Sequence, residues 1–489
     1  MLLLTVALGC VVLYLLYALF NIRPNNFPPG PPCLPIIGSF PFVPSTYLHF
    51  HMEKWAKRYG PVVGLMLGKQ PVIIVCKPKQ VLEVLQRDEF QARPENANFR
   101  LDTFNRKLGV FFSDGAFWVE QRRFTLRHLR DFGFGKSKME SLICDEIEDV
   151  VRELRDCHEF QVSRYFGLSS VNVIWALLAG SRFSRDDARL QALLDSLMRL
   201  FRSGSQTGSI VNVIPVLKLI APRITGHSEQ VEHITKLQTF FRGVIQEHRE
   251  TYSENNLRDF IDVYLQEMKA QSNNQHSTFS EEGLIVTCFD LFGAGAESIS
   301  NLLSFSLLYS ILYPQVQHKV QHLLDSVVGR DRRPCLQDRP RLQYVEAVLA
   351  EVMRLNTVAP VAPAHRVTED TTLAGYNIPK DTTMIASLWC LLSNEEHWGD
   401  PQNFRPERFL DDEGNFVKDD WMISFGTGRR TCLGEVMARN LLFLFYTTLL
   451  QQFTFTIPHG HKKPATLCLP GITTAPQPFR ATVTPRFLP

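Results

Sequence analysis

The sequence lacks the paired cysteines that mark a disulfide framework or a zinc site. Its 489 residues contain ten cysteines, and no two of them form a CxxC pair. Disulfide frameworks are dense and occur in short secreted chains, so these scattered cysteines indicate reduced thiols that face the cytosol. Cys432 alone stands in a setting unlike that of the others, within a glycine-rich segment.

An excess of charge is also missing. The formal net charge is +2 and no long run of lysine and arginine occurs, so a nucleic-acid partner is not expected. With 45% hydrophobic and 21% charged residues, the composition is that of an ordinary globular protein. The chain is long enough to enclose both a core and an internal cavity.

The first twenty residues, MLLLTVALGCVVLYLLYALF, lack any charged side chain. At about 1.5 Å per helical residue they would span about 30 Å, the thickness of a bilayer core. A cleaved signal peptide is the alternative, but there is no basic leader and no small-residue cleavage site. Arg23, Lys54 and Lys57 follow, so the positive-inside rule places the rest of the chain in the cytosol. We therefore expect an uncleaved transmembrane anchor over residues 1–21.

The remainder divides into a short hinge and one large domain. Residues 22–38 are rich in proline, which removes backbone donors and stiffens the chain, so they are expected to form a non-helical spacer. Residues 39–489 contain no further linker and no repeat. Their longest apolar stretch, residues 283–313, predicts a helix that is apolar on nearly all sides and therefore runs through the interior.

Shorter elements are predicted around this interior helix. Helices are expected over residues 190–202, 229–248, 338–356 and 435–453. Strands are expected at residues 61–67 and 71–75, within 371–386 and near the C-terminus, where β-branched residues lie between glycine and proline. The sequence thus predicts a mainly α fold with small β-sheets.

The most informative segment is residues 425–434, FGTGRRTCLG. Its glycines, Gly434 among them, allow unusual backbone geometries and let a flat cofactor approach closely. Cys432 precedes a long apolar helix, whose terminal N–H groups can stabilise a thiolate and lower its pKa. Arg430 is placed to pair with an anionic carboxylate. A glycine-rich turn with an incidental cysteine is the alternative, but Phe425, three glycines, an arginine and the cysteine all fall in register.

This segment resembles the cysteine loop of the cytochrome P450 family, and the family's other landmarks follow in order over nearly the whole chain. The resemblance implies the cytochrome P450 fold and a haem b group whose iron is ligated by the thiolate of Cys432. A thiolate ligand pushes electron density onto haem iron and favours cleavage of the O–O bond. The implied activity is monooxygenation with electrons from NADPH through a reductase. The implied cofactor-binding residues of the segment are Phe425, Arg430, Cys432 and Gly434.

Two charged motifs also match the family. Glu351 and Arg354 correspond to its Glu-x-x-Arg helix and lie one helical turn apart, where they can form an ion pair. Arg408, in the segment PERF, is expected to complete a buried Glu–Arg–Arg cluster. The resemblance assigns these three side chains to the scaffold of the haem pocket rather than to chemistry.

Four further residues match positions that face the haem propionates. Trp118 and Arg122 correspond to a Trp-x-x-x-Arg pair and share one helix face at i and i+4. Arg93 and His365 match propionate-facing positions in the microsomal branch of the family. A lone arginine or histidine is usually a surface or core residue, so these last two assignments rest on position in the family's pattern alone.

Within the predicted interior helix, residues 293–298 read GAGAES. Two nearby glycines permit a kink beside the iron, although helix packing would also explain them. The family usually has an acid followed by threonine, whose hydroxyl helps relay protons during oxygen activation. Here Glu297 and Ser298 hold these positions and are assigned as the catalytic residues. Serine keeps the hydroxyl but lacks the methyl group that restricts the rotamer of threonine, which leaves the relay open to leakage towards peroxide.

A basic helix face suits an acidic electron donor. Arg123, Arg127 and Arg130 are spaced i, i+4, i+7, with Lys136 and Lys138 just after. A merely solvated surface is the ordinary explanation. In microsomal members of the family this region docks NADPH–cytochrome P450 reductase, so the resemblance implies that partner, with cytochrome b5 as a second candidate. It also implies the cytosolic face of the endoplasmic reticulum membrane.

The substrate is expected to be apolar. Residues 359–362 and 470–473, which are expected to face the haem, are small and uncharged, and such a lining suits a lipid or terpenoid. The strongly apolar segment 209–224 lies between two of the predicted amphipathic helices. It either dips into the membrane beside the substrate entrance or packs in the core.

The pattern resembles the animal microsomal (family 2-like) branch, which includes drug-, fatty-acid- and hormone-oxidising members. The segment EQRRF at 120–124, followed by RHLR at 127–130, resembles insect members, some of which epoxidise farnesoate or methyl farnesoate. Sterol or xenobiotic hydroxylation remains open. A haem-dependent isomerase or a silent lipid binder is the alternative of another class, although an isomerase would not need the acid–hydroxyl pair.

Overall fold

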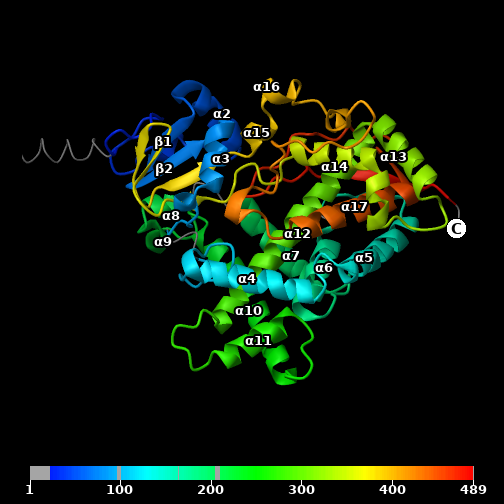
Figure 1. Cartoon of the computed structure of the whole chain (residues 1–489), viewed down its shortest axis with the longest axis horizontal. Coiled ribbons are helices and arrows are strands. Elements are labelled where there is room, and N and C mark those ends of the chain that lie inside the picture. The colour runs from blue at the N-terminus through cyan, green and yellow to red at the C-terminus, as the bar shows by residue number, and fades with distance from the viewer. Residues whose placement is uncertain (1–22, 96–100, 164, 204–209, 488–489) are drawn as a thin grey trace, which may run out of the picture.

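The computed structural model describes residues 23–95, 101–163, 165–203 and 210–487. The predicted anchor over residues 1–21 lies outside them. Residues 23–38 of the predicted hinge contain no helix, as their prolines predict. Helices dominate the described chain, which confirms the mainly α fold (Figure 1).

The helices occur in the following order along the chain. They are α2 (Leu48–Tyr59), α3 (Pro78–Gln86), α4 (Gly115–Asp131), α5 (Ser137–Arg155), α6 (Gly167–Ala179), α7 (Ala188–Ser203), α8 (Ile210–Val213), α9 (Leu217–Ile220), α10 (His227–Thr251), α11 (Phe260–Ala270), α12 (Glu281–Leu312), α13 (Pro314–Val327), α14 (Gln343–Leu355), α15 (Trp389–Leu392), α16 (Glu395–Trp398) and α17 (Glu435–Gln452). Short 3-10 helices are η1 (Phe40–Phe42), η2 (Asp88–Phe90), η4 (Leu336–Arg341), η5 (Pro406–Phe409) and η6 (Gly428–Arg430).

The strands form small sheets at the edges of the helical body. They are β1 (Val62–Leu67), β2 (Gln70–Val75), β3 (Glu159–Gln161), β4 (His365–Arg366), β5 (Thr371–Leu373), β6 (Tyr376–Ile378), β7 (Thr383–Ala386), β8 (Phe453–Thr456) and β9 (Arg480–Pro485). One sheet has the order β1-β2-β7-β4, with β2 and β7 parallel and the other pairs antiparallel. A second has the antiparallel order β3-β9-β8, and β5 pairs with β6.

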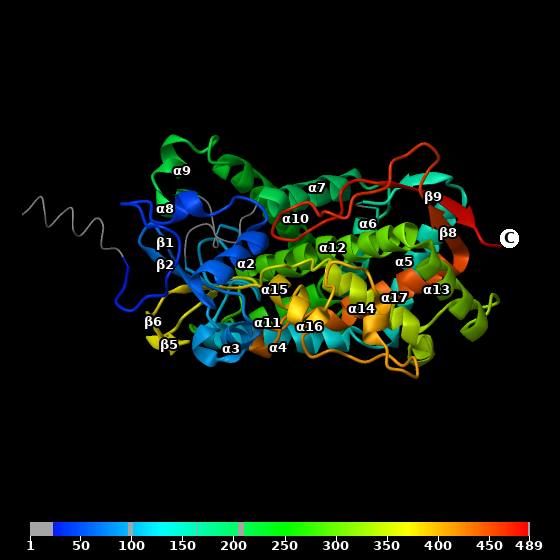
Figure 2. The ribbon, with the colours of Figure 1, turned by 90° about the horizontal axis from the view of Figure 1, so that it is seen from above.

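The predicted interior helix is α12, and it runs through the middle of the molecule. Figure 2 shows it between α7 and α10 on one side and α14 and α17 on the other. Ser280 caps its N-terminus by accepting a hydrogen bond from the backbone N–H of Gly283 at 3.1 Å. Of the described helices it alone is long and apolar enough to cross a membrane, yet 72% of its most apolar window is buried inside the protein. It is therefore a core helix.

One stripe of α12 is not covered by other side chains. Ala294 is exposed although its neighbours on both sides along the helix are buried, and Asp290 and Ser298 are half-buried. These residues are spaced i, i+4, i+8 and therefore share one face of the helix. An exposed alanine in the middle of a core helix means that this face, which we call the open stripe, borders an internal hollow rather than packed protein.

One predicted element needs correction. The helix predicted over residues 338–356 is divided into η4 and α14, and Pro340 in η4 lacks the N–H that a continuous helix would need there. The strands predicted within residues 371–386 are β5, β6 and β7, with the turn between β5 and β6 formed at Ala374 and Gly375, both at positive φ. Nine cysteines lie among the described residues and all are free thiols, as predicted.

The predicted Glu–Arg–Arg cluster is present where η5 packs against α14. Glu351 is fully buried and accepts hydrogen bonds from Arg354 at 2.7 and 2.9 Å and from Arg408 at 3.0 Å. Arg354 also donates to the carbonyls of Leu392 and Pro401. Since removing one partner of a buried pair strands a charge, at a cost of roughly 3–5 kcal/mol, this cluster holds α14 to the chain that leads into the cysteine loop.

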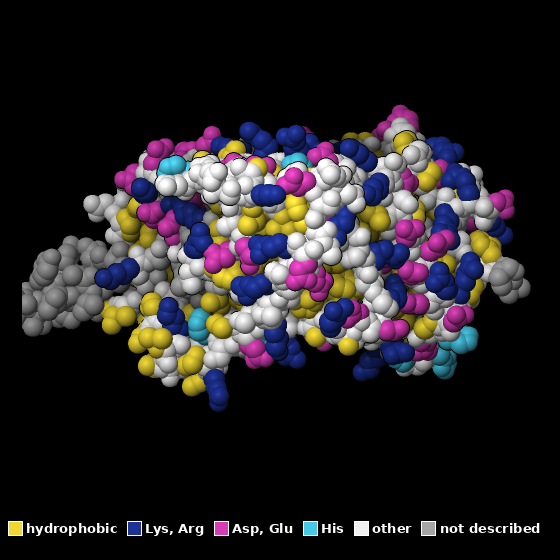
Figure 3. All heavy atoms as spheres, turned by 90° about the horizontal axis from the view of Figure 1, so that it is seen from below, with side chains coloured by type: hydrophobic (Ala, Val, Ile, Leu, Met, Phe, Trp, Pro, Cys, Tyr) yellow, Lys and Arg dark blue, Asp and Glu magenta, His cyan; other side chains and the backbone are white. Residues whose placement is uncertain are grey.

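Much of the described part of the predicted apolar segment 209–224 is exposed rather than packed in the core, although Val211 is buried. Val216 is 50% exposed, Leu219 74%, Ile220 71% and Ile224 90%. These four residues, which we call the apolar patch, lie in α9 and within four residues of its ends, beside the end of the molecule that carries β1 and β2 (Figure 2). Figure 3 shows hydrophobic side chains gathered at this corner. Core packing is thereby ruled out for these side chains.

Candidate active site

The cysteine loop is held in a tight conformation by backbone contacts. The N–H of Cys432 donates to the carbonyl of Phe425 at 2.9 Å, which closes the loop on itself. Gly426 and Gly428 both have positive φ, near 73°. A Cβ on Gly428 would also lie 2.2 Å from the carbonyl oxygen of Leu85, so the loop could not pack against α3 with any other residue there.

The Cys432 thiol faces inward yet remains accessible. Its side chain is exposed to a water-sized probe, although it lies among enough protein for burial to raise the pKa of the thiol. Hydrogen bonds from the backbone N–H groups of Gly434 and Glu435, together with the charge of Arg122, lower that pKa only in part. The helix terminus was predicted to lower the pKa of the Cys432 thiol, but burial raises this pKa by more. A thiolate at this position calls for a further positive partner, which a bound metal ion supplies.

Gly434 is the N-cap residue of α17 and lies two positions after Cys432 in the sequence. Its φ of −91° is ordinary, so backbone conformation does not demand glycine here. A Cβ on Gly434 would lie 3.9 Å from the Cys432 sulfur, at contact distance. The side chain of Phe425 is half-buried, and the guanidinium of Arg439 lies 4.9 Å from its ring centre. Both residues thus adjoin the cysteine, as predicted.

Arg430 is anchored in the same loop and points inward. Its Nε donates to the carbonyl of Gln91 at 3.0 Å and one Nη to that of Ser113 at 2.9 Å, while its other Nη is buried without a hydrogen-bond partner. The guanidinium lies 3.8 Å from the ring centre of Trp118. Burial, together with the charge of Arg93, lowers the pKa of Arg430 to about 8.

Trp118 and Arg122 lie together on α4, as their spacing predicts. Arg122 donates to the carbonyl of Thr431 at 2.7 Å, and its guanidinium lies 5.5 Å from the centre of the Trp118 ring. The indole N–H donates to the carbonyl of Val110 at 3.2 Å. The donor of Trp118 is therefore used within the protein, and its ring serves as a surface against which two guanidinium groups rest.

Arg93 and His365 approach the same place from distant parts of the chain. Arg93 is buried and donates to the carbonyls of Phe111 at 2.9 Å and Pro363 at 3.0 Å. Burial lowers its pKa to about 10. The Nδ1 of His365 lies 2.8 Å from the carbonyl of Phe90, and burial holds the pKa of this histidine well below its usual value. His365 is therefore neutral and donates from Nδ1.

The cationic cluster fits an anionic cofactor. Three guanidinium groups, those of Arg93, Arg122 and Arg430, are gathered in one buried region, where like charges repel and burial penalises each. One donor of Arg430 has no partner within the protein. A group that carries carboxylates would neutralise these charges and use the free donor. The haem that the resemblance implies has two propionates, and the accessible thiol of Cys432 lies beside the same cluster.

The two predicted catalytic residues lie side by side on α12 but have different partners. The Ser298 hydroxyl donates to the carbonyl of Ala294 at 2.6 Å, on the open stripe. The Glu297 carboxylate is buried, forms an ion pair with Arg202 of α7 and accepts a hydrogen bond from Thr473 at 3.0 Å. Its second oxygen is buried without a partner. Within the described helix, no hydrogen bond joins the two side chains.

A cavity of about 630 Å³ reaches Glu297 from the side of α7. Its walls are formed by residues near β3, by α7, by α12 and by the C-terminal loop that includes Leu469 and Ala475. Polar side chains such as Gln161 and Asn301 line part of it. Glu297 therefore lines this cavity, whereas Ser298, its neighbour in sequence, lies on the open stripe.

The glycines near this point serve helix packing. A Cβ on Gly293 would lie 3.3 Å from a methyl group of Leu197, and one on Gly295 would lie 3.6 Å from Ile174. Helix α12 continues without interruption through both positions. The packing explanation of these glycines is therefore supported.

Two acids near the open stripe were not predicted. Asp290 on α12 accepts hydrogen bonds from the backbone N–H groups of Val110 and Phe111 at 2.8 and 3.0 Å, and it thereby holds the wall of the hollow. Burial raises the pKa of Asp290 to about 8 and that of Asp102 to about 7. The available signal for Asp290 was an acid within an apolar helical run, whereas Asp102 gives none.

The predicted basic face lines a hollow of about 450 Å³ on the outer side of α4. Its lining residues are Arg123, Leu126, Arg127, Arg130, Asp131 and Lys136. Within the described chain, none of the three arginines forms an ion pair. Gly135 at the rim approaches Val436, which is 50% exposed and begins α17 just after the cysteine loop. Lys136, which lines the hollow, thus follows a residue that contacts the start of α17.

Comparison with known proteins gives one consistent result. A family model described as "Cytochrome P450" matches residues 28–483. The chain is 37% identical to farnesoate epoxidase of Bombyx mori, with 98% of this chain and 97% of that protein covered. It is 35% identical to probable cytochrome P450 305a1 of Drosophila melanogaster (96% and 97% covered) and 36% identical to human cytochrome P450 2J2 (99% and 96% covered).

Proposed function

The chain belongs to the cytochrome P450 family, and we propose that this monooxygenase epoxidises an apolar terpenoid of the farnesoate or methyl farnesoate class. When bound, the thiolate-ligated haem activates dioxygen and delivers one of its atoms to the substrate. The observation that carries the proposal is the 37% identity with Bombyx mori farnesoate epoxidase over nearly the full length of both chains.

The surroundings of the open stripe support an uncharged substrate. Val361 and Ala362 are buried, Ile472 is half-buried, and none carries a charge. Asp290, on the stripe, interacts with the carboxyl group of Asp102, and burial raises the pKa of both acids. A further acid brought to this wall would have to be desolvated beside these two carboxyl groups, so an ester suits the site better than a free carboxylate.

Hydroxylation of another apolar compound is the second candidate function. Human cytochrome P450 2J2 and cytochrome P450 2C28 of Mesocricetus auratus are each 36% identical to this chain, nearly as similar as the epoxidase. The same apolar surroundings would accept a sterol or a xenobiotic compound.

We further propose roles for the residues around the haem. Arg93, Arg122, Arg430 and His365 bind the propionate side of the cofactor, with the Trp118 ring beneath the guanidinium groups. Ser298 relays protons on the open stripe: its hydroxyl donates to the carbonyl of Ala294, and its oxygen lone pairs can accept a further hydrogen bond. Glu297 supplies protons from the cavity on the α7 side.

The electron donor and the membrane are assigned to separate surfaces. NADPH–cytochrome P450 reductase, or cytochrome b5, docks in the basic hollow of α4, which adjoins the start of α17 and so gives a short path towards Cys432. Residues 1–21 anchor the chain in the endoplasmic reticulum membrane, residues 22–38 act as the hinge, and residues 39–489 form the catalytic domain on the cytosolic face. The apolar patch rests in the same membrane.

The substrate assignment is tested by incubating the full chain with reductase, NADPH and membranes, and by comparing farnesoate, its methyl ester and a sterol. We expect an epoxide from the methyl ester and less from the acid, because the acid must be desolvated beside Asp290. Products are identified by mass spectrometry. Turnover of the sterol without any epoxide from the other two would replace the first candidate with the second.

The role of Ser298 is tested by Ser298→Ala, which removes the hydroxyl but leaves the apolar surroundings. Product formed per NADPH consumed should fall and peroxide should rise, because a positioned proton-transfer group typically contributes roughly 10²- to 10⁴-fold to a rate. Substrate-induced spectral binding should be unchanged. Ser298→Thr is the matched control and should keep coupling. Unaltered coupling in Ser298→Ala would show that protons arrive by another route.

The docking surface is tested by Arg127→Glu in the basic hollow. Reversing a charge in a steering surface should slow association with the acidic reductase, by roughly tenfold at low salt, and the difference should shrink as salt is added. Lys463→Glu, an exposed charge elsewhere, is the control. Reduction rates of the two variants in stopped flow decide the matter; equal rates would remove the hollow from the docking surface.

Membrane attachment is tested by removing residues 1–21 alone and together with Leu219→Ser, Ile220→Ser and Ile224→Ser. The truncation should release part of the protein from vesicles, and the substitutions should release the remainder, since about 0.8 kcal/mol is lost for each CH₂ group withdrawn from the apolar phase. Val417→Ser, 51% exposed but outside the patch, is the control. Sedimentation with vesicles measures the bound fraction, which Val417→Ser should not change.

A further inference from the structure

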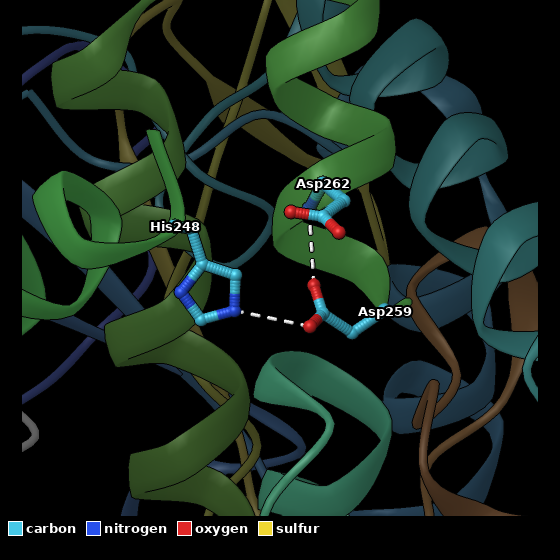
Figure 4. Close-up of side chains that lie close together, drawn as sticks. All are labelled: His248, Asp259 and Asp262. Carbon is cyan, nitrogen blue, oxygen red and sulfur yellow. Dashed lines mark hydrogen bonds and ion pairs between the residues drawn. The ribbon is translucent and has the colours of Figure 1, made fainter. Parts of the chain in front are cut away.

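A buried charged cluster lies far from the haem site, where α10 ends and α11 begins. His248 is in the last turn of α10, Asp259 is the N-cap residue of α11, and Asp262 lies in the first turn of α11 (Figure 4). His248 is 9% exposed, Asp259 1% and Asp262 0%. Among the described residues they are the one group of three side chains spaced as metal ligands would be.

The hydrogen bonds of His248 define its protonation. Its Nδ1 lies 2.8 Å from the carbonyl oxygen of Val244, and its Nε2 lies 3.0 Å from one carboxylate oxygen of Asp259. A carbonyl can only accept a hydrogen bond, so Nδ1 must donate. The other oxygen of Asp259 accepts the N–H of Asp262 at 3.0 Å, as the carboxylate of an N-cap does. Nε2 must then donate as well, and a ring that donates from both nitrogens is an imidazolium.

The charges around the ring balance without a metal ion. Arg258 binds both carboxylate oxygens of Asp262, at 2.7 and 2.8 Å, so this acid is already paired. Two cations, His248 and Arg258, thus face two anions, Asp259 and Asp262. A divalent ion would add two uncompensated charges to a buried site, and it would have to displace Arg258 from Asp262.

The other elements packed against the cluster bring no further charge. Cys288 of α12 interacts with Asp259, and burial raises the pKa of this thiol, so it stays neutral. From α6, Gly180 comes so close that a Cβ would lie 3.0 Å from the Asp259 oxygen bonded to His248. The ion pair of His248 and Asp259 is therefore enclosed by neutral groups on these sides. In such surroundings, loss of the proton from His248 would strongly weaken the interaction between the two side chains.

We infer that His248 is a buried imidazolium that latches α10 to α11, and that this latch opens as the pH rises. Each of the two helices forms a hydrogen bond to a segment that adjoins the active site. Gln238 of α10 donates to the carbonyl of Asp102 at 3.0 Å, in the wall of the hollow, and Tyr264 of α11 donates to Gln121 of α4 at 3.1 Å. The latch thereby couples the wall to the helix that carries Trp118 and Arg122. The inference is independent of the proposed substrate.

The direction of the pH dependence follows from the pKa of His248. Burial lowers this pKa, but the hydrogen bond and charge of Asp259 outweigh burial, so the pKa is raised above its usual value of 6.5. A group whose folded-state pKa is raised contributes stability that is fully present below the unfolded value and is lost as the pH rises through the folded value. The latch should therefore be closed in acid and should weaken as the pH rises through this raised pKa.

Amide hydrogen exchange of the full-length protein in detergent, followed by mass spectrometry from about pH 6 to about pH 9, tests the latch. After correction for intrinsic exchange, protection of residues 244–265 should fall with rising pH, by about tenfold for each unit that separates the folded from the unfolded pKa. His248→Gln keeps one donor for Asp259 but cannot titrate, so its protection should be lower in acid and flat with pH. Asp259→Asn keeps an N-cap but removes the charge and should lower protection in acid.

His233→Gln is the matched control, because His233 lies on the same helix with 9% exposure and neither of its ring nitrogens forms a hydrogen bond. It should keep the pH dependence of the unaltered chain. Protection that is flat with pH in the unaltered chain, or equally pH-dependent in His248→Gln, would overturn the inference. So would loss of protection on adding EDTA and its return with Zn²⁺, provided that His248→Gln shows neither, since a metal ion would then hold the cluster.

Discussion

The repulsion among three buried guanidinium groups is the interaction on which the active site depends. Arg93, Arg122 and Arg430 lie in one region with too few acids to balance them, so each is tied by hydrogen bonds to backbone carbonyls. Those carbonyls belong to segments that are far apart in sequence: Arg430 and the carbonyl of Gln91 are separated by 339 residues. The charges therefore join the sheet, α4 and the cysteine loop around a place that only an anionic group can neutralise.

Two other charge clusters, those at Glu351 and at His248, differ from this one because their charges are balanced within the protein. Glu351 accepts from both Arg354 and Arg408, and the remaining donors of these arginines meet carbonyls. His248 and Arg258 face two acids in the same balanced way. Neither cluster needs a ligand. In the cluster at Arg430, one guanidinium nitrogen has no hydrogen-bond partner within the protein. This free donor distinguishes the cluster, as a place for a ligand, from the two structural ion-pair clusters.

The central helix α12 packs in the core on most of its faces and borders the internal hollow on one face. Most of α12 is buried against α6, α10 and α17, while the open stripe leaves Ala294 exposed. The carboxylate of Asp290 accepts hydrogen bonds from backbone N–H groups of the wall of the hollow. The carboxylate of Glu297 instead forms an ion pair with Arg202 of α7. One helix therefore presents a wall, a hydroxyl and a buried, ion-paired carboxylate to separate surroundings, because successive residues point in different directions around its axis.

The sequence by itself determined the features that depend on residues close together. The cysteine loop, the Glu351–Arg354 pair, the apolar helix and the Trp118–Arg122 face all follow from local spacing, since one turn or one glycine-rich loop sets the geometry. The tertiary structure alone decided what depends on distant partners. It turned the Trp118 indole N–H to Val110, paired Glu297 with Arg202, and made burial outweigh the helix terminus at Cys432. A pKa or a free donor depends on everything packed around the group, and a linear pattern carries no record of that surrounding.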